Sequence, residues 1–140
     1  MQEINNLSNM GCNIERIKSG IPGLDNLIQG GFPKNSITLV SGPPGGGKSI
    51  FCFQFLYEGV KNNEKSLFLS LDKNSEGLLV QAKALGFDFY TAIEKGLAKF
   101  LYLNINKKFV YEKMTDEIMS GEYQRIVLDS ITPLSEMPMY

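Results

Sequence analysis

The sequence predicts an α/β fold built around a mostly parallel sheet. Short apolar runs of the kind that form strands alternate along the chain with segments that repeat apolar residues at helical spacing. A glycine-rich stretch joins one such run to the helical segment after it, and a later run ends in an aspartate. Strands that alternate with helices are joined by right-handed crossovers, so the strands run parallel.

The first third of the chain contains a leader, a short lead-in and the first expected core strand. Residues 1–13 are rich in asparagine, and we expect them to form a flexible leader before the domain at 14–140. Ile14–Lys18 alternates like a short strand, and Ser19–Gly31 contains a short apolar helix that two glycines end. A turn at 32–35 then leads into the predicted strand Ile37–Val40.

The remaining segments continue the alternation. A helix that is apolar nearly all round is expected from Lys48 to about Asn62, and such a helix is buried on most sides. The later helices carry apolar stripes and end at a glycine, whereas the strands are uninterrupted apolar runs. In chain order we expect a strand at Ser66–Leu71, a helix around Leu78–Leu85 ended by Gly86, a short helix between Phe87 and Gly96, a strand at Lys99–Leu103, a helix carrying Val110, Met114 and Ile118 and ended by Gly121, and a strand at Arg125–Asp129.

The stretch Ser41–Ser49 fits G-x-x-x-x-G-K-[ST], the phosphate-binding Walker A loop. Its glycines let successive backbone N–H groups point into one concavity at a helix N-terminus, which binds anions. In this motif Lys48 reaches the β- and γ-phosphates, and the Ser49 hydroxyl is a ligand for Mg²⁺. The alternative is a glycine-rich turn after a strand. The residues predicted to bind the nucleotide are Gly42, Gly45, Gly46, Gly47, Lys48, Ser49 and Ile50.

Composition excludes several classes of function. The net charge of −1 argues against a strong nucleic-acid surface, which needs concentrated lysine and arginine. No apolar run is long enough to span a bilayer, and the first residues lack a signal peptide, so we expect a cytoplasmic protein. Histidine is absent, which excludes histidine-based catalysis and histidine metal sites. The cysteines form no C-x-x-C, and Cys52 is expected to be a small core residue.

Three segments together resemble a known family. The lead-in Gly20–Asp25 is followed by Gly30-Gly31, and the loop is followed by Phe51, Gln54, Phe55 and Leu56. The strand Ile126–Ser130, with Thr132 after it, looks like a Walker B segment. Over Ile14 to about Pro133 the chain resembles the N-terminal part of a KaiC-type ATPase domain of the RecA/RadA superfamily. The resemblance implies a P-loop NTPase fold with three αβα layers, truncated at its C-terminus, that binds ATP or ADP with Mg²⁺ and belongs to ring-forming homo-oligomers.

The resemblance assigns roles to two carboxylates. Asp129 would hold Mg²⁺ through water opposite Ser49, and independently a carboxylate at the C-terminal end of a buried parallel strand lies where such sheets bind ligands. The alternative is an aspartate that caps a turn. Family members carry two glutamates past the second strand, one of which activates water, whereas this chain has Asp72 and Lys73. Asp72, a shorter acid, is therefore either a candidate base or an acid at a helix N-terminus beside Asn74.

Chain length is a second departure from the family. In the family sheet, a strand after Walker B inserts between the Walker B strand and the P-loop strand, and this chain stops before it. Strands are about 4.8 Å apart, so its absence would leave a gap of roughly 10 Å between Leu39 and Val127. We therefore expect a truncated domain, in which direct pairing of Ile37–Val40 with Ile126–Leu128 would contradict the family topology.

Several functions remain open from the sequence. The first is a KaiC/RecA-like ATPase with slow or absent hydrolysis, with Lys48 and Asp72 as its catalytic candidates. The second is a non-hydrolysing nucleotide-dependent regulatory module or an inactive remnant. A small-molecule kinase is disfavoured because such enzymes clamp phosphates with several arginines, and only Arg16 and Arg125 occur. A GTPase is disfavoured because the sequence contains no Asn-Lys-x-Asp element that would bind guanine. DNA recombination is disfavoured because the sequence predicts no basic face.

Overall fold

The computed structural model describes residues 14–43 and 45–130. The expected flexible leader and Thr132 lie outside these residues. A small N-terminal unit consists of β1 (Arg16–Ile17), α2 (Leu24–Leu27) and β2 (Phe32–Pro33), with β1 and β2 paired antiparallel. The helices and strands of the main body, in chain order, are α3 (Lys48–Lys61), β3 (Ser66–Ser70), α4 (Ser75–Ala84), α5 (Phe89–Glu94), β4 (Ala98–Tyr102), α6 (Val110–Ser120) and β5 (Arg125–Asp129).

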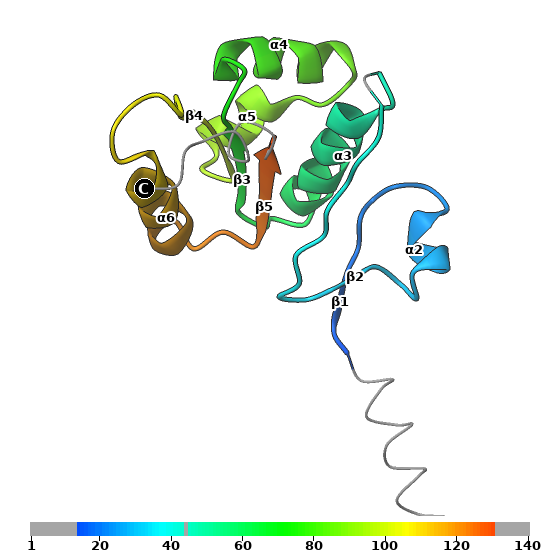
Figure 1. The fold of residues 1–140 in the computed structure, drawn as a ribbon. Coiled ribbons are helices and arrows are strands. Elements are labelled where there is room, and N and C mark those ends of the chain that lie inside the picture. The colour runs from blue at the N-terminus through cyan, green and yellow to red at the C-terminus, as the bar shows by residue number, and fades with distance from the viewer. Residues whose placement is uncertain (1–13, 44, 131–140) are drawn as a thin grey trace, which may run out of the picture.

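A parallel three-stranded sheet in the order β4-β3-β5 forms the centre of the main body (Figure 1). Ser66 pairs in register with Ala98 on one side and with Arg125 on the other, and Ser70 pairs with Asp129. Because all three strands run the same way, their carboxyl ends meet at one edge. The strand order and the parallel crossovers confirm the predicted α/β fold.

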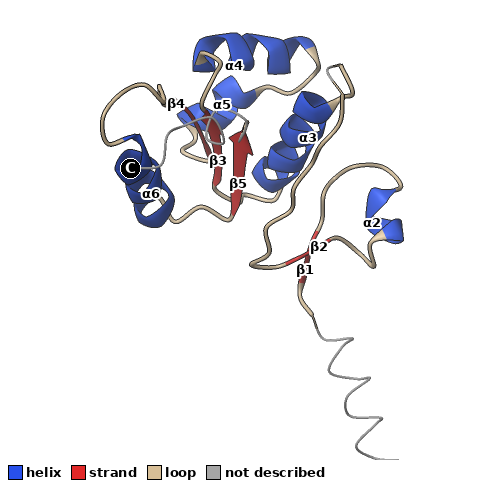
Figure 2. Ribbon diagram, in the orientation of Figure 1, coloured by secondary structure: helices blue, strands red, loops and turns tan. Residues whose placement is uncertain are grey.

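Helices cover both faces of this sheet, as Figure 2 shows. Helices α3, α4 and α5 lie on one face, and α6 lies on the other. The alternation of side chains along β3 explains the three layers, since Phe68 points into the first core and Leu67 and Leu69 point into the second. All five residues of β3 are buried, as expected for a central parallel strand.

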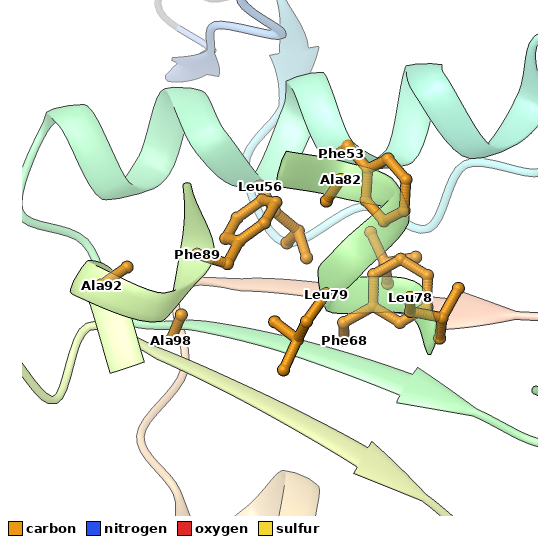
Figure 3. Close-up of a cluster of buried hydrophobic side chains, with 10 residues drawn as sticks. Phe53, Leu56, Phe68, Leu78, Leu79, Ala82, Phe89, Ala92 and Ala98 are labelled. Atoms are coloured by element: carbon orange, nitrogen blue, oxygen red, sulfur yellow. The ribbon is translucent and has the colours of Figure 1, made fainter. Parts of the chain in front are cut away.

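The larger core lies between β3 and the three helices on its face (Figure 3). Phe68 stacks on Phe100 of β4 with ring centroids 5.0 Å apart, and Phe53 of α3 lies 5.6 Å from Phe68. These aromatic residues belong to the core, as their helical and strand periodicity predicts. The buried members of this cluster are Phe53, Leu56, Phe68, Leu78, Leu79, Ala82, Phe89, Ala92, Ala98 and Val127.

The prediction of a strand at Ile37–Val40 is wrong for this structure. These residues form no strand, and the side chains of Ile37 and Leu39 are 100% and 71% exposed. Among the described residues, none pairs with the free edge of β5, so an extended segment there gains no ladder of hydrogen bonds. Its backbone groups face solvent instead, which avoids the cost of burying them unpaired. The direct pairing that would contradict the family topology does not occur.

A second difference concerns the turn expected at 32–35. Phe32 and Pro33 form β2, and the turn is confined to Lys34 and Asn35. The Phe32 ring packs 5.9 Å from Phe55 of α3, which attaches the N-terminal unit to the main body. Among the described residues, no helix is long and apolar enough to cross a membrane.

Candidate functional site

Two glycines of the glycine-rich loop adopt a backbone conformation that other residues rarely adopt. Gly45 and Gly47 have φ angles of +79° and +87°, in the left-handed region that favours glycine. The Gly46 N–H donates to the Pro43 carbonyl oxygen at 3.0 Å, which closes a tight turn. Gly47 is the N-cap of α3 and supplies no side chain to the first turn. The first N–H groups of α3 therefore remain available to an anion.

Lys48 begins α3 beside this loop. Its Nζ donates a hydrogen bond of 2.8 Å to the carbonyl oxygen of Gly42, the first glycine of the motif. The lysine side chain is thus directed back along the loop. Ser49, the next residue of α3, is half-buried. Both residues lie at the end of α3 where the loop enters the helix, as the motif predicts.

Asp129 lies at the carboxyl end of β5, and the turn after β3 passes beside it. The Leu71 N–H donates to the Asp129 carbonyl oxygen at 3.1 Å. Burial raises the pKa of the Asp129 carboxyl above its ordinary value, and the nearby Asp72 carboxylate raises it further. Lys73 and Lys48 act in the opposite direction on this pKa. The structure therefore places the turn that carries Asp72 beside Asp129, at the carboxyl ends of β3 and β5.

Asp72 lies in the turn between β3 and α4 and is exposed. The N-cap of α4 is Asn74, whose Oδ1 accepts from the Glu76 N–H at 2.8 Å. Asp72 therefore lies two residues before the cap of α4 and does not cap it, and its two alternatives, a base or an acid at the helix N-terminus, both stay predictions. Within the described part of the chain, the Asp72 side chain accepts no hydrogen bond that would orient it as a base.

Cys52 occupies a position one turn into α3 that sequence reasoning assigned only to the core. The thiol is half-buried, and burial together with the nearby Asp129 carboxylate raises its pKa to about 11. The Cys52 side chain packs against the larger core cluster, as the sequence predicts. Its neutral thiol adds no charge to an edge that already carries two carboxylates and two lysines.

Sequence reasoning missed the residues that hold the lead-in. The Ser19 N–H and hydroxyl both donate to Oδ1 of Asp25, at 3.0 and 2.7 Å. Partial burial would raise the pKa of Asp25, but these hydrogen bonds outweigh it and the pKa is lowered. Gln54 Nε2 donates to the Gly20 carbonyl oxygen at 2.9 Å, which ties the lead-in to α3. The only sequence signal for these contacts was the resemblance of Gly20–Asp25 to the lead-in motif of the family.

Both arginines of the chain make contacts away from the loop. Arg16 Nη1 donates to the Gly31 carbonyl oxygen at 3.2 Å within the N-terminal unit. Arg125 is 2% exposed, and its guanidinium pairs with Glu64 and donates to the Lys18 and Phe55 carbonyl oxygens. Neither arginine is placed to clamp a transferring phosphate.

The residues present fit a nucleotide with Mg²⁺. The loop offers backbone donors and a lysine to phosphate, and Ser49 and Asp129 are the hard oxygen ligands that Mg²⁺ prefers. Among the described residues, no three histidine, cysteine or carboxylate side chains form a metal cage. Mg²⁺ in phosphate sites is usually held by one or two carboxylates plus the phosphates, so such a cage is not needed.

Comparison with known proteins identifies relatives over nearly the whole chain. Residues 17–139 match the family described as KaiC ATPase. The chain is 42% identical over 142 aligned residues to UPF0273 protein MJ1359 of Methanocaldococcus jannaschii, covering 86% of this chain and 58% of the relative. It is 33% identical over 137 residues to UPF0273 protein PH0284 of Pyrococcus horikoshii, covering 85% and 56%.

A solved structure agrees with these matches. The crystal structure of the KaiC-like protein PH0186 from Pyrococcus horikoshii superposes with a TM-score of 0.75 at 32% identity. The match covers 87% of this chain and 56% of that one. The chain therefore spans a little over half the length of the relatives it matches, and within that span its fold is the RecA-like arrangement of a parallel sheet between helices.

Proposed function

This chain belongs to the KaiC ATPase family, and we propose that it binds Mg·ATP on the loop Gly42–Ser49. The observation that supports the proposal is the packing of α3, which follows this loop directly, against β5, which ends at Asp129. Two left-handed glycines, the open first turn of α3 and Lys48 supply donors to phosphate. Asp129 supplies a half-buried carboxylate at the adjoining strand end.

Each predicted residue has a role in this proposal. Lys48 pairs with the β- and γ-phosphates, and the N–H groups of the loop glycines and Ile50 surround them. The Ser49 hydroxyl and the Asp129 carboxylate hold Mg²⁺, which would neutralise phosphate charge. ADP would use the same contacts except those to the terminal phosphate.

We propose that hydrolysis is slow or absent. A general base must lie within hydrogen-bond reach of the attacking water and hold it in line. Asp72 is the carboxylate nearest this task, but it is exposed and no hydrogen bond from the described residues orients it. Its side chain is also one methylene shorter than a glutamate. The same observation favours the second candidate, a nucleotide-dependent regulatory module that does not hydrolyse ATP.

A thermal melt with and without Mg·ATP tests the binding proposal. A ligand at 100 times its Kd should stabilise the folded chain by about 2.7 kcal/mol. Lys48→Ala should abolish this shift. Lys95→Ala should retain it, because Lys95 lies just before the start of β4, at the amino ends of the strands and away from the loop. A wild-type melt that Mg·ATP leaves unchanged would overturn the proposal.

An ATP turnover assay separates the two candidates. If the chain is a slow ATPase, Asp72→Asn should remove turnover while Mg·ATP still raises the melting temperature. If the wild-type chain binds Mg·ATP but shows no turnover above the Lys48→Ala background, the regulatory module is the correct description. By family analogy we also propose homo-oligomeric assembly and a cytoplasmic location, which sizing chromatography with Mg·ATP and cell fractionation would test.

A further inference from the structure

Lys73 is held in a fixed place beside the candidate site. The Ser70 hydroxyl donates to the Lys73 carbonyl oxygen at 2.7 Å and accepts from the Lys73 N–H at 3.0 Å. Ser70 is 1% exposed, so the anchor of this turn is buried in the sheet. Asn74 then fixes the chain again as the N-cap of α4. The backbone of Lys73 is therefore constrained on both sides.

The Lys73 side chain itself is exposed and unpaired. Among the described residues it forms no ion pair and donates no hydrogen bond, unlike the lysines that pair with Glu15, Glu58 and Glu117. Its turn leaves β3 at Ser70, which is in register with Asp129. The Leu71 N–H of the same turn donates to the Asp129 carbonyl oxygen at 3.1 Å, so the turn that carries Lys73 lies directly beside Asp129.

We propose that Lys73 makes this site distinguish nucleoside triphosphates from diphosphates by pairing its ammonium with the terminal phosphate. The inference rests on the proposed binding of Mg·ATP to the loop. In that binding mode the chain of phosphates runs along the loop, and its terminal group reaches the carboxyl ends of the neighbouring strands. The turn that carries Lys73 leaves from one of those ends, beside Asp129.

Charge explains why the pairing favours the triphosphate. The edge already holds the carboxylates of Asp72 and Asp129, which repel a terminal phosphate. Lys48 and Mg²⁺ are shared with the β-phosphate, so both nucleotides benefit from them. A second lysine that reaches only the terminal phosphate adds a charge-assisted hydrogen bond to the triphosphate alone. A diphosphate leaves that lysine in water and gains nothing from it.

Dissociation constants for Mg·ATP and Mg·ADP, measured by calorimetry, test the inference. Lys73→Gln should weaken ATP binding about 10-fold, as expected for loss of one hydrogen bond between charged groups, and leave ADP binding within about twofold. Lys73→Arg retains the charge and should keep most of the preference for ATP. Lys95→Gln removes the same charge near the amino ends of the strands, away from the loop, and should change neither dissociation constant.

The outcomes separate this inference from the proposed function. If the wild-type chain binds neither nucleotide, the proposed function fails and the inference fails with it. If the wild-type chain binds both, but Lys73→Gln leaves the ratio of the two constants unchanged, only the inference is overturned. Equal weakening of ATP and ADP binding by Lys73→Gln also overturns it, because a general charge effect would act on both. Thermal melts of each variant without nucleotide confirm that the exposed substitutions leave the fold intact.

Discussion

Arg125 donates a hydrogen bond of 2.6 Å from its guanidinium to the backbone carbonyl oxygen of Lys18, 107 positions earlier in the chain. The same guanidinium pairs with Glu64 at 3.0 Å, donates to the Phe55 carbonyl oxygen at 2.9 Å and lies 4.8 Å over the Phe55 ring. One buried side chain thus connects the lead-in, α3 and β5. Helix α3 follows the phosphate loop directly, and β5 ends at Asp129.

Replacing Arg125 should therefore destabilise the whole fold. Arg125→Met leaves Glu64 without its partner and removes one hydrogen bond from each of two carbonyl oxygens, and we expect a loss of about 3–5 kcal/mol in the free energy of unfolding. Arg125→Lys should also be destabilising, because one ammonium cannot reproduce the planar fork of donors. Urea denaturation measures both variants. Wild-type stability of Arg125→Lys would show that the three contacts contribute little.

Gly59 of α3 provides a second test of this packing. A Cβ at Gly59 would lie 2.5 Å from Cδ and 2.9 Å from Nε of Arg125. Gly59→Ala should cost about 1–3 kcal/mol through overpacking, despite the better helix propensity of alanine. Gly77 of α4 is the matched control, since a Cβ there meets nothing within 4 Å. Gly77→Ala should stabilise the chain by about 0.5–1 kcal/mol. Urea denaturation would confirm the contrast if the midpoint falls below that of the wild type for Gly59→Ala and rises above it for Gly77→Ala.

Asp129→Asn should have opposite effects with and without nucleotide. The folded-state pKa of Asp129 is raised, so at neutral pH the ionised carboxylate costs stability in the ligand-free chain. The substitution should raise the ligand-free melting temperature at pH 7 and remove the Mg²⁺-dependent part of the shift with ATP. As pH falls from neutral through the raised folded pKa toward 3.8, wild-type Asp129 becomes protonated and its cost disappears. Melts across this range should show the advantage of Asp129→Asn shrinking, and an advantage independent of pH would contradict the assignment.

Cys52 should react slowly with thiol reagents in the folded chain. With its pKa raised to about 11 by burial and by Asp129, the thiolate fraction at pH 8 is about 100-fold or more below that of a free cysteine. In a Cys12→Ser background, labelling by Ellman's reagent should be slow in buffer and fast in guanidinium. Asp129→Asn should speed the reaction, because it removes the negative charge that opposes the thiolate. Equal labelling rates with Asp129 and with Asp129→Asn would show that the Asp129 carboxylate does not affect the Cys52 thiol.

Local signals in the sequence determined most of what was predicted correctly. Periodicity located the central strand β3, the all-round apolar helix α3 and the stripe of α6, because each depends on residues close together in the chain. The motif Gly42–Ser49 likewise carries its own geometry in glycines whose left-handed φ angles need no tertiary contact. The family resemblance followed from these same segments and is confirmed.

Tertiary structure alone decided the features that depend on distant partners. Ile37–Val40 has the composition of a strand, but strands require a neighbour, and none of the described residues pairs with it. The role of Arg125 could not be found in the sequence, since its acceptors lie on Lys18 and Phe55, far away along the chain. The position of the turn that carries Lys73 beside Asp129 likewise depends on the register of β3 with β5, since Ser70 pairs with Asp129.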